Sequence, residues 1–384
     1  KHDINSKFNN MKSIIVIGGG FSGLACIKRL LTYRGKAEIT LINDKQDFNF
    51  LPLLPDCISG RVNPEYLTFN LANLSRRINF VKERVTGIDL EGKRVVSSGL
   101  TFNYDFLLVG SGTETNFYGN EEIRKAAIKL DNTDDVNSFI GVMSQGRVSA
   151  YVIAGAGYTG IEVATNLRVV LNKQGIKGKI VIVERATSIL GPLPQWMKDY
   201  VLTNLKNMDI EVLTDLSVDR VYGRRIDLSG GQVFDDAVLI WTAGVETSAF
   251  IRNLNVEKSP QGRIRVDEYL RFNDSCFAAG DAAFFSYKDS YLRMAVQFSI
   301  VQGDCAGLNI IKSMQGKSLV KYRPVDLGYI IPMANNRSCG ILFGFKVKGV
   351  FPVFLHYLMC IYRSLGLRNK LGVLLSVASF RLKW

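Results

Sequence analysis

The chain has 384 residues, 47% of them hydrophobic and 22% charged, with 35 glycines and a net charge of +13. This composition predicts a folded chain of two or three domains and excludes a largely disordered protein. With only two histidines and six scattered cysteines that form no CxxC pair, we exclude a zinc site and a serine-histidine hydrolase, expect no bound metal, and interpret the cysteines as reduced thiols.

The first third of the chain predicts a βαβ unit of parallel type. A buried strand at 13–18 (SIIVIG) is followed by a helix at 22–31 and a second strand at 37–43. Residues 148–155, 159–174 and 178–184 repeat this order. The repeat predicts two domains of the same architecture and not a short solenoid repeat.

The first strand-to-helix turn carries a GxGxxG motif at Gly18, Gly20 and Gly23. In such a turn the glycines allow a tight bend, close approach of a pyrophosphate and close packing of helix on strand. The phosphate then lies at the positive N-terminus of the helix. At the end of the second strand, either Asn43 or Asp44 is positioned to hold ribose hydroxyls, and the sequence leaves the choice open.

The second turn repeats the motif at Gly155, Gly157 and Gly160, and Glu184 ends the following strand. A carboxylate at this place accepts hydrogen bonds from a ribose 2′-hydroxyl and repels a 2′-phosphate. We therefore expect this copy to bind NADH and not NADPH.

Between and after the two motifs lie strands that end in small residues, at 104–119, 236–247 and 275–285. We expect the second nucleotide domain to be inserted in the first. The predicted boundaries are 1–112 and 266–330 for the first domain, 113–265 for the second, and 331–384 for a C-terminal region.

The order VIGGGFSGL, NFLPLLPDCISGRV, YDFLLVGSGT, AGAGYTGIEVA, VLIWTAGV and AAGDAA resembles the two-dinucleotide flavoproteins, most closely the type II NADH dehydrogenases, which are non-pumping NADH:quinone oxidoreductases. Relatives that reduce disulfides or oxidise sulfide need flavin-side cysteines, whereas Cys57 is single. The resemblance implies FAD on the first motif and NADH on the second. It also implies the site residues, flavin-side Gly18, Gly20, Phe21, Ser22, Gly23, Asn43 or Asp44, Gly112, Gly280 and Asp281, and nicotinamide-side Gly155, Gly157, Tyr158, Thr159, Gly160, Glu162, Glu184 and Gly244.

The family's quinone helix reads roughly AQxxxQQG, and here the corresponding run is VQFSIVQG from Val296. Gln297 and Gln302 keep their places, while Val296 and Val301 replace an alanine and a glutamine. Gln297 and Gln302 are therefore the predicted quinone contacts, with a solvent-facing helix as the alternative. Glu162 is a candidate proton donor, with a buried helix cap as the alternative.

The tail is basic, with eight Lys or Arg and no Asp or Glu after Asp326. Its longest uncharged run, residues 349–362, is too short to cross a bilayer. A last helix would carry Leu371, Leu374, Leu375, Ala378 and Leu382 on one stripe and Val373, Val377 and Phe380 on the opposite side. We expect an in-plane membrane anchor on an anionic lipid surface, with a core helix pair or a homodimer interface as alternatives, and no nucleic-acid binding.

Together these features predict an α/β protein with two Rossmann-like dinucleotide-binding domains and a C-terminal amphipathic helical region. The expected activity is electron transfer from NADH through FAD to a membrane quinone at the cytoplasmic face of the cell membrane. The alternatives are a membrane-associated flavoprotein that serves as a redox sensor or assembly subunit, and a flavin reductase with a soluble acceptor.

Overall fold

The computed structural model describes residues 11–144, 148–287 and 290–382, so His2 lies outside the described part. The chain divides into two compact units. The first unit comprises residues 1–48, 70–114 and 246–326, and the second comprises 49–69, 115–245 and 327–384. The boundaries expected from the sequence, at 112, 265 and 330, stay predictions.

The first unit is built on a six-stranded sheet with the order β20-β21-β9-β1-β2-β5. The strands other than β20 run parallel to their neighbours. In sheet order they are β20 (Arg271–Asn273), β21 (Cys276–Ala278), β9 (Phe106–Val109), β1 (Lys12–Ile17), β2 (Ala37–Asn43) and β5 (Asn79–Lys82). The middle strands are apolar because both faces of a parallel sheet are covered.

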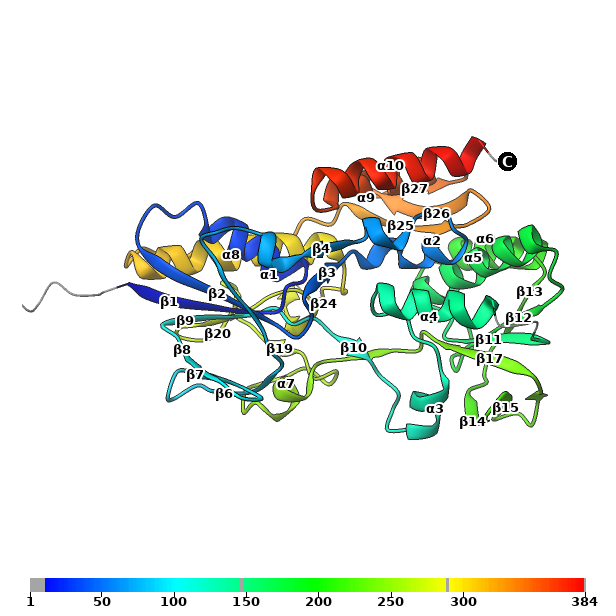
Figure 1. Cartoon of the computed structure of the whole chain (residues 1–384), viewed down its shortest axis with the longest axis horizontal. Coiled ribbons are helices and arrows are strands. Elements are labelled where there is room, and N and C mark those ends of the chain that lie inside the picture. Colours follow the sequence, from blue (N-terminus) through cyan, green and yellow to red (C-terminus); the bar gives the residue numbers. More distant parts are fainter. Residues whose placement is uncertain (1–10, 145–147, 288–289, 383–384) are drawn as a thin grey trace, which may run out of the picture. The chain divides into compact units, whose positions relative to one another are not determined.

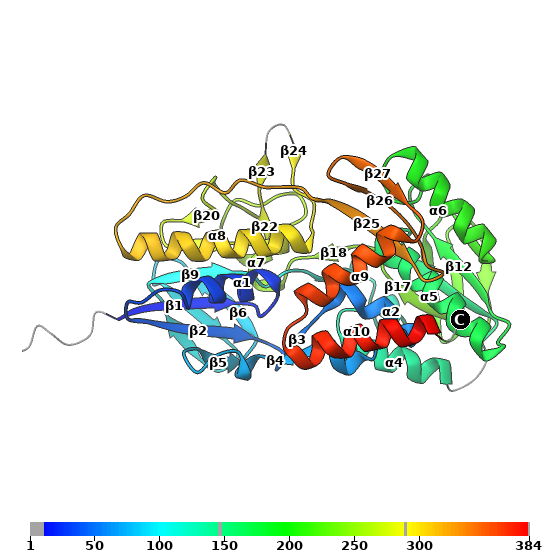
Figure 2. The ribbon, with the colours of Figure 1, turned by 90° about the horizontal axis from the view of Figure 1, so that it is seen from above.

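Helices α1 (Phe21–Leu30) and α8 (Val296–Met314) lie side by side on one face of this sheet (Figures 1 and 2). The other face carries α7 (Ala249–Asn253) and a three-stranded antiparallel sheet. Those strands are β6 (Val85–Asp89), β7 (Arg94–Ser97) and β8 (Thr101–Asn103). Apolar side chains between the layers, such as Ile15, Leu107 and Ile251, form the core on this side.

The second unit repeats the parallel arrangement with the order β13-β12-β11-β17. These strands are β13 (Ile210–Leu213), β12 (Lys179–Val183), β11 (Ala150–Ala154) and β17 (Ala237–Trp241). Its helices are α2 (Leu54–Ile58), α3 (Glu121–Ala126), α4 (Thr133–Ser144), α5 (Tyr158–Gln174) and α6 (Gln195–Asn207). A small sheet of β14 (Val218–Tyr222), β15 (Arg225–Leu228) and β16 (Val233–Phe234) packs on the opposite face from α5.

The C-terminal region belongs to the second unit. Its antiparallel strands are β25 (Gly328–Met333), β26 (Arg337–Leu342) and β27 (Phe345–Lys348), and its helices are α9 (Phe351–Arg363) and α10 (Leu367–Leu382). Ile331, Met333 and Cys339 join the apolar cluster around α5. Figure 2 shows α9 and α10 next to each other. Pro352 stands in the first turn of α9 and Gly366, at φ +79°, follows its end.

The described residues also form several short elements. The remaining strands are β3 (Asp47–Asn49), β4 (Thr68–Asn70), β10 (Glu114–Thr115), β18 (Val245–Glu246), β19 (Ile264–Arg265), β22 (Ala283–Phe284), β23 (Ser286–Tyr287) and β24 (Ser290–Tyr291). Four 3-10 turns cover Leu51–Leu53, Pro64–Tyr66, Leu71–Asn73 and Gly280–Ala282.

Candidate functional site

The first glycine turn joins β1 to α1 and has the geometry of a phosphate cradle. Gly18 has φ +99°, and a Cβ on Gly23 would stand 1.9 Å from the Gly18 carbonyl oxygen. Only glycine therefore fits at these two positions. A Cβ on Gly20 would meet no described atom within 4 Å, which leaves open space directly before the helix. The first turn of α1 carries no acidic residue, so a phosphate is favoured there.

The structure brings Asn43, and not Asp44, against this turn. The Asn43 Oδ1 atom accepts a hydrogen bond from the Gly19 amide at 2.8 Å, and its Nδ2 donates to the Lys45 carbonyl at 2.8 Å. Asp44 instead forms an exposed ion pair with Arg84 at 3.3 Å. Asn43, and not Asp44, therefore places a side-chain oxygen beside the cradle, and this oxygen can accept a further hydrogen bond.

Phe21 and Ser22 open α1. The Phe21 ring packs edge-on against Phe48 with centroids 5.2 Å apart. Ser22 is 4% exposed, and its hydroxyl stands 2.9 Å from where a Cβ on Gly110 or on Gly280 would lie. Ser22 therefore packs against Gly110 and Gly280, next to the cradle. Gly112, at φ +68°, has open space at its Cα.

The late Gly-Asp segment forms the 3-10 turn that follows β21. Gly280 has φ +71°, and its amide donates to the Gln302 side chain at 2.7 Å. Burial raises the pKa of the Asp281 carboxyl, and the nearby Arg263 guanidinium opposes this shift. The Arg263 Nε also donates to the Asp281 carbonyl at 3.0 Å. The turn thus presents a carboxylate from a firmly held backbone.

The second glycine turn, between β11 and α5, copies the first. Gly155 has φ +102°, a Cβ on Gly160 would lie 2.0 Å from the Gly155 carbonyl oxygen, and a Cβ on Gly157 would meet no described atom within 4 Å. Thr159 is exposed at the start of α5, and the Tyr158 ring meets Tyr329 edge-on at 6.1 Å. The turn therefore offers a second open cradle.

Glu184 ends β12 and takes the place that Asn43 has in the first unit. Its Oε2 accepts from the Ala156 amide at 2.8 Å and its Oε1 from the Ala186 amide at 2.9 Å. Each oxygen keeps a further lone pair for a ligand hydroxyl. Gly244, at φ +92°, follows β17, and a Cβ there would strike the Tyr118 hydroxyl at 2.2 Å.

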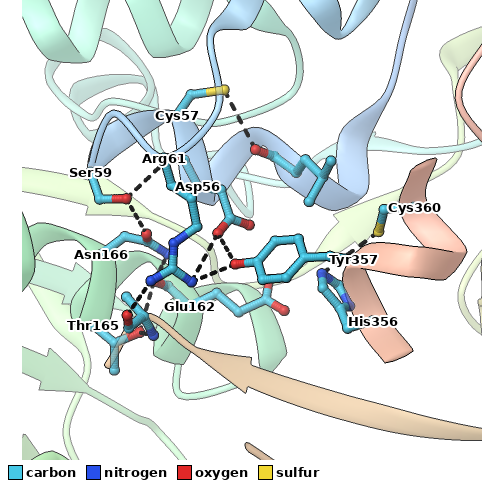
Figure 3. Close-up of polar contacts among 12 residues, drawn as sticks. Asp56, Cys57, Ser59, Arg61, Glu162, Thr165, Asn166, His356, Tyr357 and Cys360 are labelled. Atoms are coloured by element: carbon cyan, nitrogen blue, oxygen red, sulfur yellow. Dashed lines mark hydrogen bonds and ion pairs between the residues drawn. The ribbon is translucent and has the colours of Figure 1, made fainter. Parts of the chain in front are cut away.

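Glu162, one turn into α5, is half-buried beside a buried polar cluster shown in Figure 3. Burial and the Asp56 carboxylate raise its pKa well above 4.5. Among the described atoms no hydrogen bond reaches its carboxylate, while its backbone carbonyl accepts from Asn166 at 2.9 Å and from Thr165 at 3.1 Å. The raised pKa favours the protonated form of this carboxyl more than in an ordinary glutamate.

The centre of this cluster is an ion pair between Arg61 and Asp56, 3.9 Å apart and at most 7% exposed. The Tyr357 hydroxyl donates to Asp56 at 2.6 Å and accepts from Arg61 at 2.5 Å. Burial raises the pKa of Asp56 although Arg61 and Tyr357 lower it. His356, next to Tyr357, has a pKa lowered to about 4 by burial and by nearby arginines. This cluster was not predicted from the sequence, where its one signal is a pair of charges, Asp56 and Arg61, within the apolar run at 50–62.

Gln297 and Gln302 lie on different sides of α8. The Gln297 Nε2 donates to Asp326 at 2.9 Å on the accessible side, one turn from Val301, which is 49% exposed. Gln302 is 2% exposed and holds the Gly280 amide. The structure therefore does not bring the two predicted quinone contacts together.

The tail helices have the two faces expected from the sequence. Val373 and Phe380 are buried, at 0% and 7%, whereas Leu371, Leu374 and Leu375 are 58%, 48% and 67% exposed. On α9 and the preceding hairpin the exposed apolar side chains are Phe343, Phe345, Phe351, Phe354, Leu358, Met359 and Tyr362. No helix in the described ranges is long and apolar enough to span a membrane.

The described residues also bear on metal binding and on the thiols. They contain no group of three or more His, Cys, Asp or Glu side chains that could hold a metal ion. All six cysteines lie within the described ranges as free thiols, and five of them are buried.

Comparison with known proteins supports the resemblance seen in the sequence. Curated relatives include the type II NADH:quinone oxidoreductase of Staphylococcus aureus (strain NCTC 8325), 24% identical over 374 residues that cover 90% of this chain and 93% of the relative. Among solved structures, NDH2 from Plasmodium falciparum in complex with NADH superposes with a TM-score of 0.84 at 18% identity, covering 97% of this chain and 98% of that one. The sulfide:quinone oxidoreductase of Aquifex aeolicus gives 0.77 at 17% identity, covering 94% and 92%.

These matches confirm the predicted α/β class with Rossmann-like domains. The profile of the pyridine nucleotide-disulphide oxidoreductases matches residues 12–303, about three quarters of the chain. The chain belongs to the pyridine nucleotide-disulphide oxidoreductase family.

Proposed function

We propose that this protein oxidises NADH through a bound FAD and passes the electrons to a membrane quinone. The observation that carries the proposal is the duplicated cradle. Each unit places a side-chain oxygen, from Asn43 or Glu184, on the middle amide of a glycine turn that opens a helix. The curated type II NADH:quinone oxidoreductases support the choice of reaction.

FAD fits the first unit. The open space at Gly20 and the N-terminus of α1 suit its pyrophosphate, Asn43 suits the adenosine ribose, and Asp281 suits the ribityl hydroxyls. Bound there, FAD supplies the capacity to take two electrons from NADH and return them to a quinone. The residues of the chain position the cofactor.

NADH fits the second unit. The two outer lone pairs of the Glu184 carboxylate accept hydrogen bonds from ribose hydroxyls, and its negative charge disfavours a 2′-phosphate. Thr159, Tyr158 and Gly244 border the same cradle and make up the proposed contacts around the nucleotide.

The proposed acceptor side is the accessible face of α8 with Gln297. The Nε2 atom of Gln297 donates to the carboxylate of Asp326, which in turn accepts two hydrogen bonds from the guanidinium of Arg293. Quinol formation also consumes two protons, and Glu162 is the proposed donor of one of them because its raised pKa keeps it protonated at higher pH than an ordinary carboxyl.

We also place the protein on the cytoplasmic face of the membrane as a peripheral protein. The exposed leucines of α10 and the aromatic side chains of α9 and the β26–β27 hairpin would enter the interfacial region. Lys346, Lys348, Arg368 and Lys370 lie on these same elements and would attract anionic headgroups. A homodimer that buries the leucine face is the competing occupant, and we expect no nucleic-acid binding.

The test begins with the purified protein. An FAD spectrum that NADH bleaches, followed by steady turnover with a short-chain quinone, is the expected result. Bleaching at full rate without quinone turnover would instead indicate a redox sensor or assembly subunit. Turnover with ferredoxin or rubredoxin, and none with quinone, would indicate a reductase with a soluble acceptor.

A further inference from the structure

Gln302 is buried in α8, and its side chain serves the Gly-Asp turn of the same unit. The Gln302 Oε1 accepts the Gly280 amide proton at 2.7 Å. Gly280 is itself buried, so without Gln302 its N–H would be a buried donor without a partner. Such a donor costs more than the bond itself contributes. The bond therefore fixes the backbone from which Asp281 projects.

The neighbours of Gln302 in α8 fix that helix against α1. A Cβ on Gly303 would stand 2.0 Å from the Ser22 carbonyl oxygen, and one on Gly307 would stand 2.9 Å from that of Cys26. The two helices thus approach as closely as backbones allow. On the outer side, Arg29 of α1 binds both carboxylate oxygens of Asp304, at 2.9 and 2.6 Å.

These two sets of contacts join the segments proposed to hold two adjacent parts of the cofactor, its pyrophosphate and its ribityl chain. The N-terminus of α1 would hold the pyrophosphate, and the Gly280–Ala282 turn would present Asp281 to the ribityl chain. Because α8 is fixed on α1 and Gln302 reaches from α8 to Gly280, the bond from Gln302 fixes the turn relative to the phosphate cradle at Gly280, one residue after the sheet bond from the Ala279 amide to the Val109 carbonyl. Ser22 and Ser299 pack against the Cα of Gly280 from α1 and α8 and leave no room for a side chain.

We propose that Gln302 is a positioning residue for FAD, which sets the distance between the phosphate cradle and the Asp281 turn, and that it is not a quinone contact. This inference rests on the proposed FAD site. It assigns to the acceptor face of α8 only Gln297 and the exposed Val301, on the side of the helix away from Gly280.

The test measures FAD binding to apoprotein by quenching of flavin fluorescence, independently of turnover. Gln302→Met keeps the length and volume of the side chain but removes the strong acceptor. Its dissociation constant for FAD is expected to rise about tenfold, as the loss of one buried hydrogen bond implies. Gln302→Asn keeps the amide but is one methylene shorter, so it should lose the bond to Gly280 and weaken FAD binding similarly. Gln315→Met, at the exposed end of α8, is the matched control and should bind FAD as the wild type does.

A second readout separates positioning from quinone contact. With FAD saturating, the quinone KM of Q302M is expected to stay within about twofold of the wild-type value. Unchanged FAD affinity in Q302M and Q302N would overturn the inference, as would a raised quinone KM with normal FAD affinity, or a lower unfolding temperature of the apoprotein with normal FAD affinity. A wild-type protein that binds no FAD would refute the proposed function itself.

Discussion

The buried ion pair between Arg61 and Asp56 offers the most direct test of how the second unit is held together. Arg61 also donates to the Ala334 carbonyl at 2.5 Å and stacks over Phe380 of α10 at 4.5 Å. The Arg61 side chain, which follows α2, thus contacts the turn between β25 and β26, helix α9 and helix α10. Replacing Arg61 with Met keeps much of the apolar packing but leaves the Asp56 carboxylate buried without its cation.

We expect Arg61→Met to destabilise the second unit by about 3 to 5 kcal/mol, the cost of breaking a buried pair from one side. Asp56→Asn, which leaves the guanidinium unpaired, should cost a similar amount. The double variant leaves neither charge alone, so its loss should fall short of the sum of the two single losses by about 2 to 3 kcal/mol.

Tryptophan fluorescence suits the measurement because the two tryptophans in the described ranges, Trp196 and Trp241, both belong to the second unit. Urea unfolding of the wild type, both single variants and the double variant completes the cycle. Lys179→Met, which removes an exposed pair with Glu211, is the control and should change stability by no more than about 1 kcal/mol. Losses that add to within about 0.5 kcal/mol would refute the coupling inferred here.

Three further outcomes are expected. Glu184→Ser should reduce the preference for NADH over NADPH by at least about tenfold in kcat/KM, since the repulsion of a 2′-phosphate is lost; an unchanged ratio would contradict the role of Glu184. Because the pKa of Glu162 is raised on folding, the native state binds more protons than the unfolded state above pH 4.5, so stability falls as pH rises through that range. Glu162→Gln should flatten this slope in urea unfolding measured from pH 5 to 8, and a slope equal to that of the wild type would be the contrary result. Leu374→Gln with Leu375→Gln should weaken binding to anionic vesicles about tenfold or more without lowering the unfolding temperature, whereas loss of a dimer with vesicle binding intact would favour the homodimer.

The glycine turns were predictable because their requirements are local. A residue with φ near +100° directly after a buried strand must be glycine, and the packing of helix on strand demands another glycine five positions later. The amino-acid sequence alone therefore locates both cradles, at Gly18 and Gly155. The choice between Asn43 and Asp44 needed coordinates, since both follow the strand and only the register of β2 decides which side chain turns towards Gly19.

The two faces of the last helix were predictable from the sequence, but the residues against which its buried face packs were not. Leucines at helical spacing predict a stripe, and the stripe at Leu371, Leu374 and Leu375 is exposed while Val373 and Phe380 are buried. The buried face packs against segments far away in the chain, since Phe380 clusters with Val169 and Ala334 and lies under the guanidinium of Arg61, some 300 positions earlier. A contact of that sequence separation leaves no periodic signal, and only the presence of Asp56 and Arg61 in an otherwise apolar run hinted at it.

In the predicted quinone helix, helical periodicity shows which residues share a face, and a match to a motif does not. In an α-helix, residues five apart differ by about 140° in direction, whereas residues four apart differ by about 40°. Gln297 and Gln302 therefore cannot share a face, and the natural partner of Gln297 is position 301, where this chain has valine. The accessible face of α8 thus offers one amide beside an apolar side chain, while the second glutamine is bound to Gly280. If this face receives the acceptor, it holds the headgroup by hydrogen bonding on one side and by apolar contact on the other.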